Sequence, residues 1–411
     1  MRRRSSRRKR FSSLKWLAII LLIVLVGYFA YREIGIGVRI EPSTNGPVIK
    51  IDVPTIELQL PSPVAGQPSQ PPAAAQPTLA PGSEPEGWYN IYFTTPRYPD
   101  KPEYHHGGLD TQLVAFINSA QKTVDIAVYD FDLENVANAL SKAAARGVRV
   151  RMVTDTDTLT NENPKVQKAF DILRQAKIPI VDDQRGPIMH DKFVVGDGAA
   201  VWTGSWNFTD GDTYRLNNNA IRIVSRQLAQ NYTVEFEKMF MQRSFGPSKP
   251  AGGTEPLVTL QGVRIENYFA PEDGVAGTIT GRLDQAQQSI HFMAFSFTSD
   301  AIGNAMLARA KAGVSVAGVF EKTGSETQYS EFGKMRKAGL DVLQDGNPYV
   351  MHHKVIIIDG RTVIFGSYNF SNNADRDNDE NLLIVDDPAL AQAFEAEFQR
   401  VREVALHPLK K

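Results

Sequence analysis

Two segments of the sequence carry the same polar residues at the same spacing. In the first, His190 and Lys192 are followed by Asp197 and by Gly204-Ser205-Trp206-Asn207; in the second, His352 and Lys354 are followed by Asp359 and by Gly366-Ser367-Tyr368-Asn369. In both segments the Asp stands seven positions after the His, and the Gly seven positions after the Asp. Imidazole, ammonium, hydroxyl and amide groups around one point suit a phosphate diester, because they combine proton transfer with donors for the phosphate oxygens.

The repetition of the pattern gives this interpretation its weight. A lone His on a strand edge is usually no more than a satisfied polar residue, but here six residues are specified together. From average residue usage, the whole pattern has a chance on the order of one in a hundred million at a given start. Its occurrence twice in one chain indicates function.

A pair of short strands must position these residues. Residues two apart face the same side of a strand, so the His and Lys of each pair are predicted to point together into one site. Apolar runs at 193–195 and 355–358 continue this strand, and a second strand at 200–203 or 362–365 returns to the Gly-Ser turn. Backbone N–H groups, the hydroxyl and the Asn amide can converge there on an anion.

A longer repeat surrounds the two segments. Residues 116–150 align with residues 282–316 at a constant offset of 166 without a gap. In each copy a helical segment, an apolar strand, a helix closed by glycine and another strand follow one another. Strands that alternate with helices predict an α/β domain present twice, with a first repeat at 88–245, a breaker-rich interdomain linker at 246–256 and a second repeat at 257–405.

Both segments resemble the HKD motif of the phospholipase D superfamily, H-x-K-x4-D-x6-G-S-x-N. The resemblance extends over residues 88–405 and implies a duplicated phospholipase D-like domain: two mixed β-sheets flanked by helices, arranged as a pseudo-dimer with one active site at the interface. It also implies that no metal and no cofactor takes part, which agrees with a sequence that has no cysteine and no carboxylate-histidine ligand cluster. The catalytic residues that it implies are His190, Lys192, Asn207, His352, Lys354 and Asn369.

The resemblance further implies a two-step displacement through a covalent phosphohistidine. Because the His of the first repeat is usually the nucleophile in relatives, His190 is predicted to attack phosphorus and His352 to act as acid and base. The two lysines and two asparagines of the motif would hold the non-bridging oxygens. Ser205 and Ser367 are predicted to support the site.

One position differs between the repeats. When Gly204 is laid on Gly366, Asn218 falls opposite Glu380; in the family, a carboxylate or amide here orients a His ring. Glu380 is predicted to raise the pKa of the acid His352, and Asn218 to fix the tautomer of the nucleophile His190 without adding charge. Asp197 and Asp359 are predicted to be structural, tying the turn and the domain interface, with a direct catalytic role as the alternative.

The N-terminal part has a different composition. Residues 1–15 hold eight basic side chains and no acidic one, and residues 16–31 form an uncharged apolar run. This run predicts one transmembrane helix, an uncleaved signal anchor, with a cleaved signal peptide and a core helix as alternatives. The positive-inside rule places the basic tail in the cytoplasm and the catalytic region outside it. Residues 32–87 are predicted to be a juxtamembrane and Pro-rich linker.

The charge balance bears on the substrate. After residue 15 the chain has 37 basic and 46 acidic residues, a balance of −9, which offers no obvious duplex-binding face. The sequence therefore predicts an enzyme that hydrolyses phospholipid headgroups at a membrane. The alternatives are an endonuclease that cleaves DNA or RNA with the same two-His site, a cardiolipin-synthase-like phosphatidyl transferase, and an inert binding scaffold. The scaffold is disfavoured because none of the six motif residues is lost; the oligomeric state stays open.

Overall fold

The computed structural model describes residues 37–41, 48–52 and 87–408. The chain divides into two compact units, residues 1–79 and 80–411. In the first unit, β1 (Gly37–Glu41) pairs with β2 (Val48–Asp52) in an antiparallel sheet, so part of the segment predicted as linker is a hairpin. The predicted anchor at 16–31 lies outside the described residues. Among the helices that the structure describes, none has the length and apolarity needed to cross a membrane.

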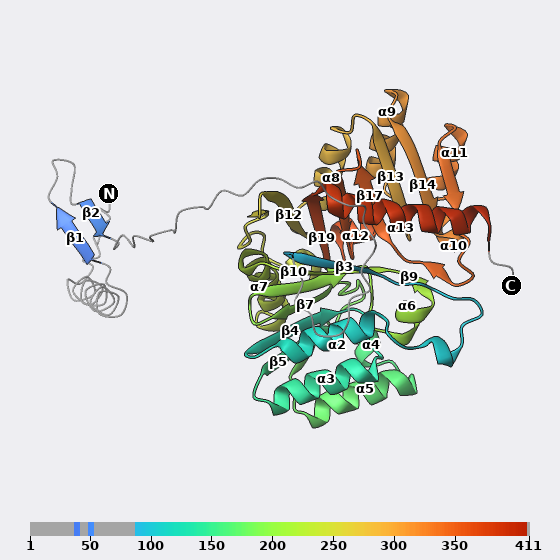
Figure 1. Cartoon of the computed structure of the whole chain (residues 1–411). Helices are drawn as coiled ribbons and strands as arrows, with labels where there is room; N and C mark the ends of the chain where they lie inside the picture. The colour runs from blue at the N-terminus through green and yellow to red at the C-terminus, as the bar shows by residue number, and fades with distance from the viewer. Residues whose placement is uncertain (1–36, 42–47, 53–86, 409–411) are drawn as a thin grey trace, which may run out of the picture. The chain divides into compact units, whose positions relative to one another are not determined.

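The first repeat is built on a seven-stranded mixed sheet (Figure 1). Strands β4, β5 and β6 run parallel, and every other neighbouring pair is antiparallel. In spatial order the strands are β3 (Tyr89–Phe93), β10 (Asn219–Val224), β8 (Ala200–Gly204), β7 (Lys192–Gly196), β4 (Thr123–Val128), β5 (Arg149–Thr154) and β6 (Ile180–Asp182).

The second repeat has an eight-stranded sheet with the same order and one additional edge strand, β11. Its strands are β11 (Leu257–Leu260), β12 (Val263–Ala270), β19 (Glu380–Asp386), β18 (Thr362–Gly366), β17 (Lys354–Ile358), β13 (Ser289–Ala294), β14 (Ser315–Phe320) and β15 (Asp341–Gln344). The duplication predicted from the sequence is therefore present, strand for strand.

Helices cover the outer face of each sheet. The first repeat has α2 (Leu109–Ser119), α3 (Glu134–Ala145), α4 (Thr156–Leu159) and α5 (Pro164–Gln175); the second has α8 (Val275–Leu283), α9 (Asp300–Lys311), α10 (Lys322–Ser325) and α11 (Phe332–Lys337). Helix α3 buries Val136, Leu140 and Ala143 on one stripe, as a 3.6-residue period requires. Gly147 and Gly313 follow α3 and α9 with positive φ angles of 89° and 96°, the backbone that a glycine stop supplies.

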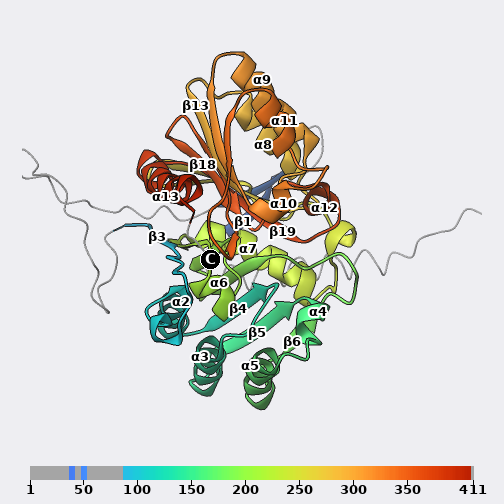
Figure 2. The same cartoon turned by 90° about the vertical axis from the view of Figure 1, so that its right-hand side faces the viewer.

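A shared core joins the two repeats. Helices α7 (Arg226–Phe240) and α13 (Pro388–Leu406) lie between the two sheets in both views (Figures 1 and 2). Each helix packs on its own sheet and also contacts the other repeat, α7 at β12 and α13 at β3. The core between the sheets takes large side chains from both repeats, among them Tyr232, Phe236, Phe365 and Phe394. Burial of this shared apolar surface holds the repeats in one orientation.

The segment predicted as interdomain linker is anchored by a buried cation. After a 3-10 turn at Gly246–Ser248, the fully buried Lys249 pairs with Glu235 on α7 and lies 3.1 Å from Glu272 and 3.0 Å from Asp379. Glu235 belongs to the first repeat, and the other two carboxylates belong to the second. The linker therefore contributes an ionic contact to the interface that it crosses.

Candidate active site

Immediately before each motif His, the backbone contacts the other repeat. Met189 forms a bridge with Asp379, and the His190 N–H donates to the carbonyl of Asp379 at 2.9 Å. In the second repeat, β16 (Val350–Met351) pairs with β9 (Leu216–Asn217), and the His352 N–H donates to the carbonyl of Asn217 at 3.0 Å. Strands β7 and β17 begin only at the motif lysines. Each His therefore stands before its own strand and against the segment that leads into a strand of the other repeat, β19 for His190 and β10 for His352.

His190 is held by the carboxylate of the other repeat. Its Nδ1 lies 2.7 Å from Oε2 of Glu380, and the same oxygen accepts the hydroxyl hydrogen bond of Ser367 at 2.7 Å. Glu380 is fully buried and His190 is nearly so. Because a carboxylate can only accept, Nδ1 carries the proton and Nε2 of His190 is left for chemistry.

His352 is held by an amide in the corresponding place. Its Nδ1 lies 2.9 Å from Oδ1 of Asn218, which also accepts the Ser205 hydroxyl at 2.9 Å. The prediction that Asn218 orients His190 and Glu380 orients His352 is therefore wrong. Each His pairs with the orienting residue of the other repeat because the contacts before the motif strands place His190 beside the start of β19 and His352 beside the start of β10.

The glycine of each Gly-Ser turn allows the serine to reach its partner. Gly204 has a φ of 152°, and a Cβ there would lie 2.3 Å from the carbonyl oxygen of Asn219. Only glycine permits this approach of β8 to β10. Ser205 then donates to Asn218, and Gly366 makes the same approach to Asn381 so that Ser367 reaches Glu380.

The two motif lysines are buried between the histidines and aromatic rings. Lys192 donates to the carbonyl of His190 at 2.8 Å, and Lys354 donates to that of His352 at 2.8 Å. Their ammonium groups lie 5.3 Å from the Tyr129 ring centre and 4.5 Å from the Phe295 ring centre. Each ammonium group keeps donors beyond its single hydrogen bond, which suits the non-bridging oxygens of a phosphate.

The motif asparagines add unsatisfied polar atoms. Oδ1 of Asn207 and Oδ1 of Asn369 are buried, and neither has a hydrogen-bond partner within the described part of the chain. A buried amide oxygen without a hydrogen-bond donor costs free energy. A ligand group or water that donates a hydrogen to these oxygens would remove that cost.

Burial and the lysines favour neutral imidazoles in the free site. Burial lowers the pKa of His190 to about 4, against the opposing effect of Glu380, and the Lys192 charge adds to the lowering. Burial together with Lys354 and Lys192 holds the pKa of His352 well below its ordinary range. Burial also lowers the pKa of Lys192, to about 8. An anionic diester would offset the lysine charges and so raise both imidazole pKa values, which couples substrate binding to proton uptake.

The motif aspartates lie at the far end of the strands from the histidines. Asp197 and Gly198 both have positive φ and begin the three-residue turn between β7 and β8, as Asp359 and Gly360 do between β17 and β18. The Asp197 carboxylate accepts the backbone N–H groups of Gln121, Lys122 and Thr123 at 2.7–3.1 Å. Five residues of strand place it about 16 Å from Lys192. These contacts tie the turn to the start of β4 within one repeat. The prediction that Asp197 also contacts the domain interface is therefore wrong.

Removal of this carboxylate is expected to affect stability and not chemistry. Burial alone would raise the pKa of Asp197, but the three backbone donors hold it below its ordinary value. The contribution is therefore present at neutral pH and is lost as the pH falls through the carboxyl range. Asp197→Ala should lower the free energy of unfolding by about 1–3 kcal/mol at pH 7, by urea denaturation, with turnover per folded chain unchanged. A loss of turnover with unchanged stability would contradict this role.

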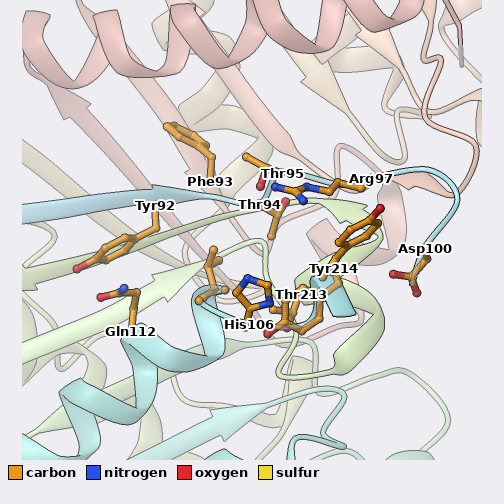
Figure 3. A pocket seen from close by; sticks show the side chains of 14 residues that line it. Tyr92, Phe93, Thr94, Thr95, Arg97, Asp100, His106, Gln112, Thr213 and Tyr214 are labelled. Carbon is orange, nitrogen blue, oxygen red and sulfur yellow. The ribbon is translucent and has the colours of Figure 1, made fainter. Parts of the chain in front are cut away.

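A separate cavity lies beside the short helix α6 (Asp210–Tyr214). It has a volume of about 210 Å³, and Figure 3 shows His106, Thr213 and Tyr214 among the side chains that line it. None of the six motif residues, all of which the structure describes, lines this cavity. The neighbouring His105 is bonded by Asp100 at 2.7 Å and Asp210 at 3.0 Å, as a structural histidine is.

The sequence analysis did not predict one residue that lies next to the site. Asp212 on α6 accepts from the backbone N–H of Asn207 at 3.2 Å and lies 3.5 Å from Nδ1 of His352. The sequence contains one indication of it: at the motif offset of 162 residues, Asp212 falls opposite the uncharged Ala374. The described residues contain no group of three or more His, Asp and Glu side chains that could hold a metal ion.

The chain is similar to proteins of one family. The family model described as "Cardiolipin synthase, PLD-like domain" matches residues 113–240 and 279–402. A phospholipase D of Rickettsia felis is 30% identical over 159 residues, which are 39% of this chain and 80% of the relative. A mitochondrial cardiolipin hydrolase of Xenopus tropicalis is 33% identical over 149 residues, 35% of this chain and 69% of the relative.

A solved structure is similar over both repeats. The phosphatidylserine synthase of Haemophilus influenzae aligns with a TM-score of 0.56 at 13% identity and covers 77% of this chain and 86% of its own. This likeness supports the duplicated fold. With the family model matched in both repeats, the chain belongs to the phospholipase D superfamily.

Proposed function

We propose that this protein hydrolyses the headgroup ester of phospholipids through a covalent phosphohistidine and without a metal ion. One observation carries the proposal: two buried histidines from opposite repeats are each hydrogen-bonded at Nδ1, so that Nε2 of each has no partner among the described residues. Two buried lysines accompany them. This arrangement supplies a nucleophile, a proton carrier and cationic donors for one phosphate.

The first step forms the bond to the enzyme. Nε2 of His190 attacks phosphorus, and protonated His352 gives its Nε2 proton to the oxygen of the leaving headgroup as the phosphorus–oxygen bond breaks. The ring of His190 gains positive charge as the nitrogen–phosphorus bond forms. Glu380, 2.7 Å from Nδ1, stabilises that charge.

The second step releases the product. Neutral His352 takes a proton from water, the resulting hydroxide attacks phosphorus, and the nitrogen–phosphorus bond breaks. Phosphatidic acid leaves, His190 returns to its neutral form, and His352 is protonated again. This assignment of roles follows the family resemblance alone. The predicted electrostatic support, in which Glu380 raises the pKa of His352, does not apply because Glu380 is bonded to His190.

The choice of a lipid substrate rests on three observations. Similar proteins are named phospholipase D and cardiolipin hydrolase, the chain after residue 15 has a balance of −9, and residues 16–31 have the composition of a membrane anchor. We propose a single span with the N-terminus in the cytoplasm and the catalytic unit outside it. Such an anchor would hold the site within reach of a bilayer.

The substrate class can be tested with the purified full chain in excess chelator. Mixed phospholipid vesicles and single- and double-stranded DNA are incubated in parallel, and released headgroup, phosphatidic acid and DNA fragments are measured. We expect headgroup release with intact DNA, and no effect of the chelator. DNA cleavage with intact lipid would overturn the lipid substrate, and activity that needs an added divalent ion would overturn the metal-free mechanism.

A further inference from the structure

The two repeats place one carboxylate each near the opposite His, but at different positions. In the second repeat Glu380 begins β19 and Ala374 lies on α12 (Asn372–Arg376). In the first repeat the matching residues are Asn218 and Asp212. The carboxylate has thus been exchanged between two positions six residues apart.

Asp212 lies in contact with the residues around His352. Its Oδ1 accepts from the Asn218 amide at 3.2 Å and from the backbone N–H and the side-chain amide of Asn207 at 3.2 Å and 3.3 Å, and it lies 3.5 Å from Nδ1 of His352. Its Oδ2 accepts the Thr209 hydroxyl at 2.9 Å. Because all these partners donate hydrogen, the geometry suits an ionised carboxylate.

The contact with Asp212 decides which way the Asn218 amide faces. Nδ2 of Asn218 donates to the carbonyl and to Oδ1 of Asp212, each at 3.2 Å. The amide oxygen must then face the Ser205 hydroxyl and Nδ1 of His352. An oxygen at that place requires a proton on Nδ1, which leaves Nε2 of His352 free to exchange a proton with substrate and water.

We propose that Asp212 is the carboxylate partner of His352: it orients the imidazole through Asn218 and supplies the negative charge that the imidazolium form needs. This inference rests on the proposed role of His352 as acid and base. Asp212 is a positioning residue, since it acts on the reaction through His352 and Asn218. The first repeat thereby keeps the function of the Glu380 position with a different residue.

Other charges act on the same groups and set the background for a pH measurement. Lys192 on β7 and Lys354 on β17 act on both Asp212 and His352. His190 and His353 also disfavour the charged form of His352, and the charge of Asp212 raises the pKa of Asp130. Burial raises the pKa of Asp212, against the lowering by the Thr209 and Asn207 donors and both lysines. All these groups stay in place in the variants below.

The test compares Asp212→Asn, Asp212→Ala and the double variant Asp212→Ala with Asn218→Glu in the full chain. Loss of the charge should lower turnover of a phospholipid about 10- to 100-fold and move the alkaline limb of its pH profile down by about one pH unit or more. The double variant, which copies the second repeat, should return the limb toward its original place. Asp210→Asn is the matched control, because Asp210 lies on the same helix and pairs with His105, Lys165 and Arg215 instead.

A second substrate separates proton donation from general damage. In bis(4-nitrophenyl) phosphate the nitrophenolate leaves without a proton, so Asp212→Asn should slow this diester less than the phospholipid. Equal slowing of both substrates, an unmoved limb and no recovery in the double variant would show that Asp212 is only structural.

A readout without turnover keeps this inference distinct from the proposed function. The His352 ring is titrated by nitrogen NMR in the wild-type chain and in Asp212→Asn, with the signal identified by its loss in His352→Ala. We expect the Nδ1–H tautomer in the wild type and a lower imidazole pKa in the variant. An unchanged ring would overturn the inference, whereas a wild type inactive on both substrates with the expected ring signals would overturn only the proposed function.

Discussion

A chain with His190→Ala is expected to lose headgroup release by about 10⁴-fold or more, because the variant has no atom that can form the covalent bond to phosphorus. The loss should occur without unfolding. Glu380, left without its imidazole, still accepts the Ser367 hydroxyl at 2.7 Å and the Asn378 amide at 3.3 Å. Initial rates on the substrate found for the wild type, with a thermal melt of both chains, measure the two effects separately.

The control for this variant is another histidine of the same unit. His105 is bonded by Asp100, which lines the cavity of Figure 3, and by Asp210, and neither bond reaches the motif. His105→Ala should therefore keep turnover per folded chain even if it lowers the melting temperature. A His190→Ala chain as active as His105→Ala would rule out the proposed nucleophile.

Much of this site could be predicted from residue type and spacing. The motif strands, the Asp-Gly turns and the repeated order of strands and helices follow from local patterns that act over a few residues. The turn at Asp197 is an example, because an Asp-Gly pair between two apolar runs favours a hairpin without help from the rest of the chain. The six motif residues were predicted from the same local pattern.

The pairing of each His with its orienting residue could not be predicted in this way. It depends on the bridge between Met189 and Asp379 and on the pairing of β16 with β9, which join residues far apart in sequence. The hydrophobic pattern of neither segment predicts which distant segment it pairs with. The order of residues within one repeat favours Asn218 as the partner of His190, and only the packed interface places His352 beside Asn218 instead.

The importance of Asp212 is visible in the sequence only as a difference between the two repeats. When the motifs are aligned, Asp212 falls opposite Ala374 and Asn218 falls opposite Glu380. Each repeat therefore has one carboxylate in this pair of positions, but at a different position. Their connection needs side-chain geometry, since six residues of turn and short helix separate the two positions. The sequence alone gives no reason to expect one carboxylate to replace the other.

The covalent step should become visible when His352 is replaced. With bis(4-nitrophenyl) phosphate, a His352→Ala chain can complete the first step, because the nitrophenolate leaves without a proton. It lacks the base that activates water for the second step. The variant is therefore expected to release a burst of one nitrophenolate per chain and then to turn over at least about 10²-fold more slowly than the wild type.

The position of the phosphorus in that arrested chain tests the central claim most directly. The chain is digested under alkaline conditions, which preserve phosphohistidine, and the peptides are analysed by mass spectrometry. The account predicts one nitrophenylphosphoryl group per chain, on His190. No burst, or phosphorus on another residue, would contradict it, as would an adduct on His352 in the His190→Ala chain.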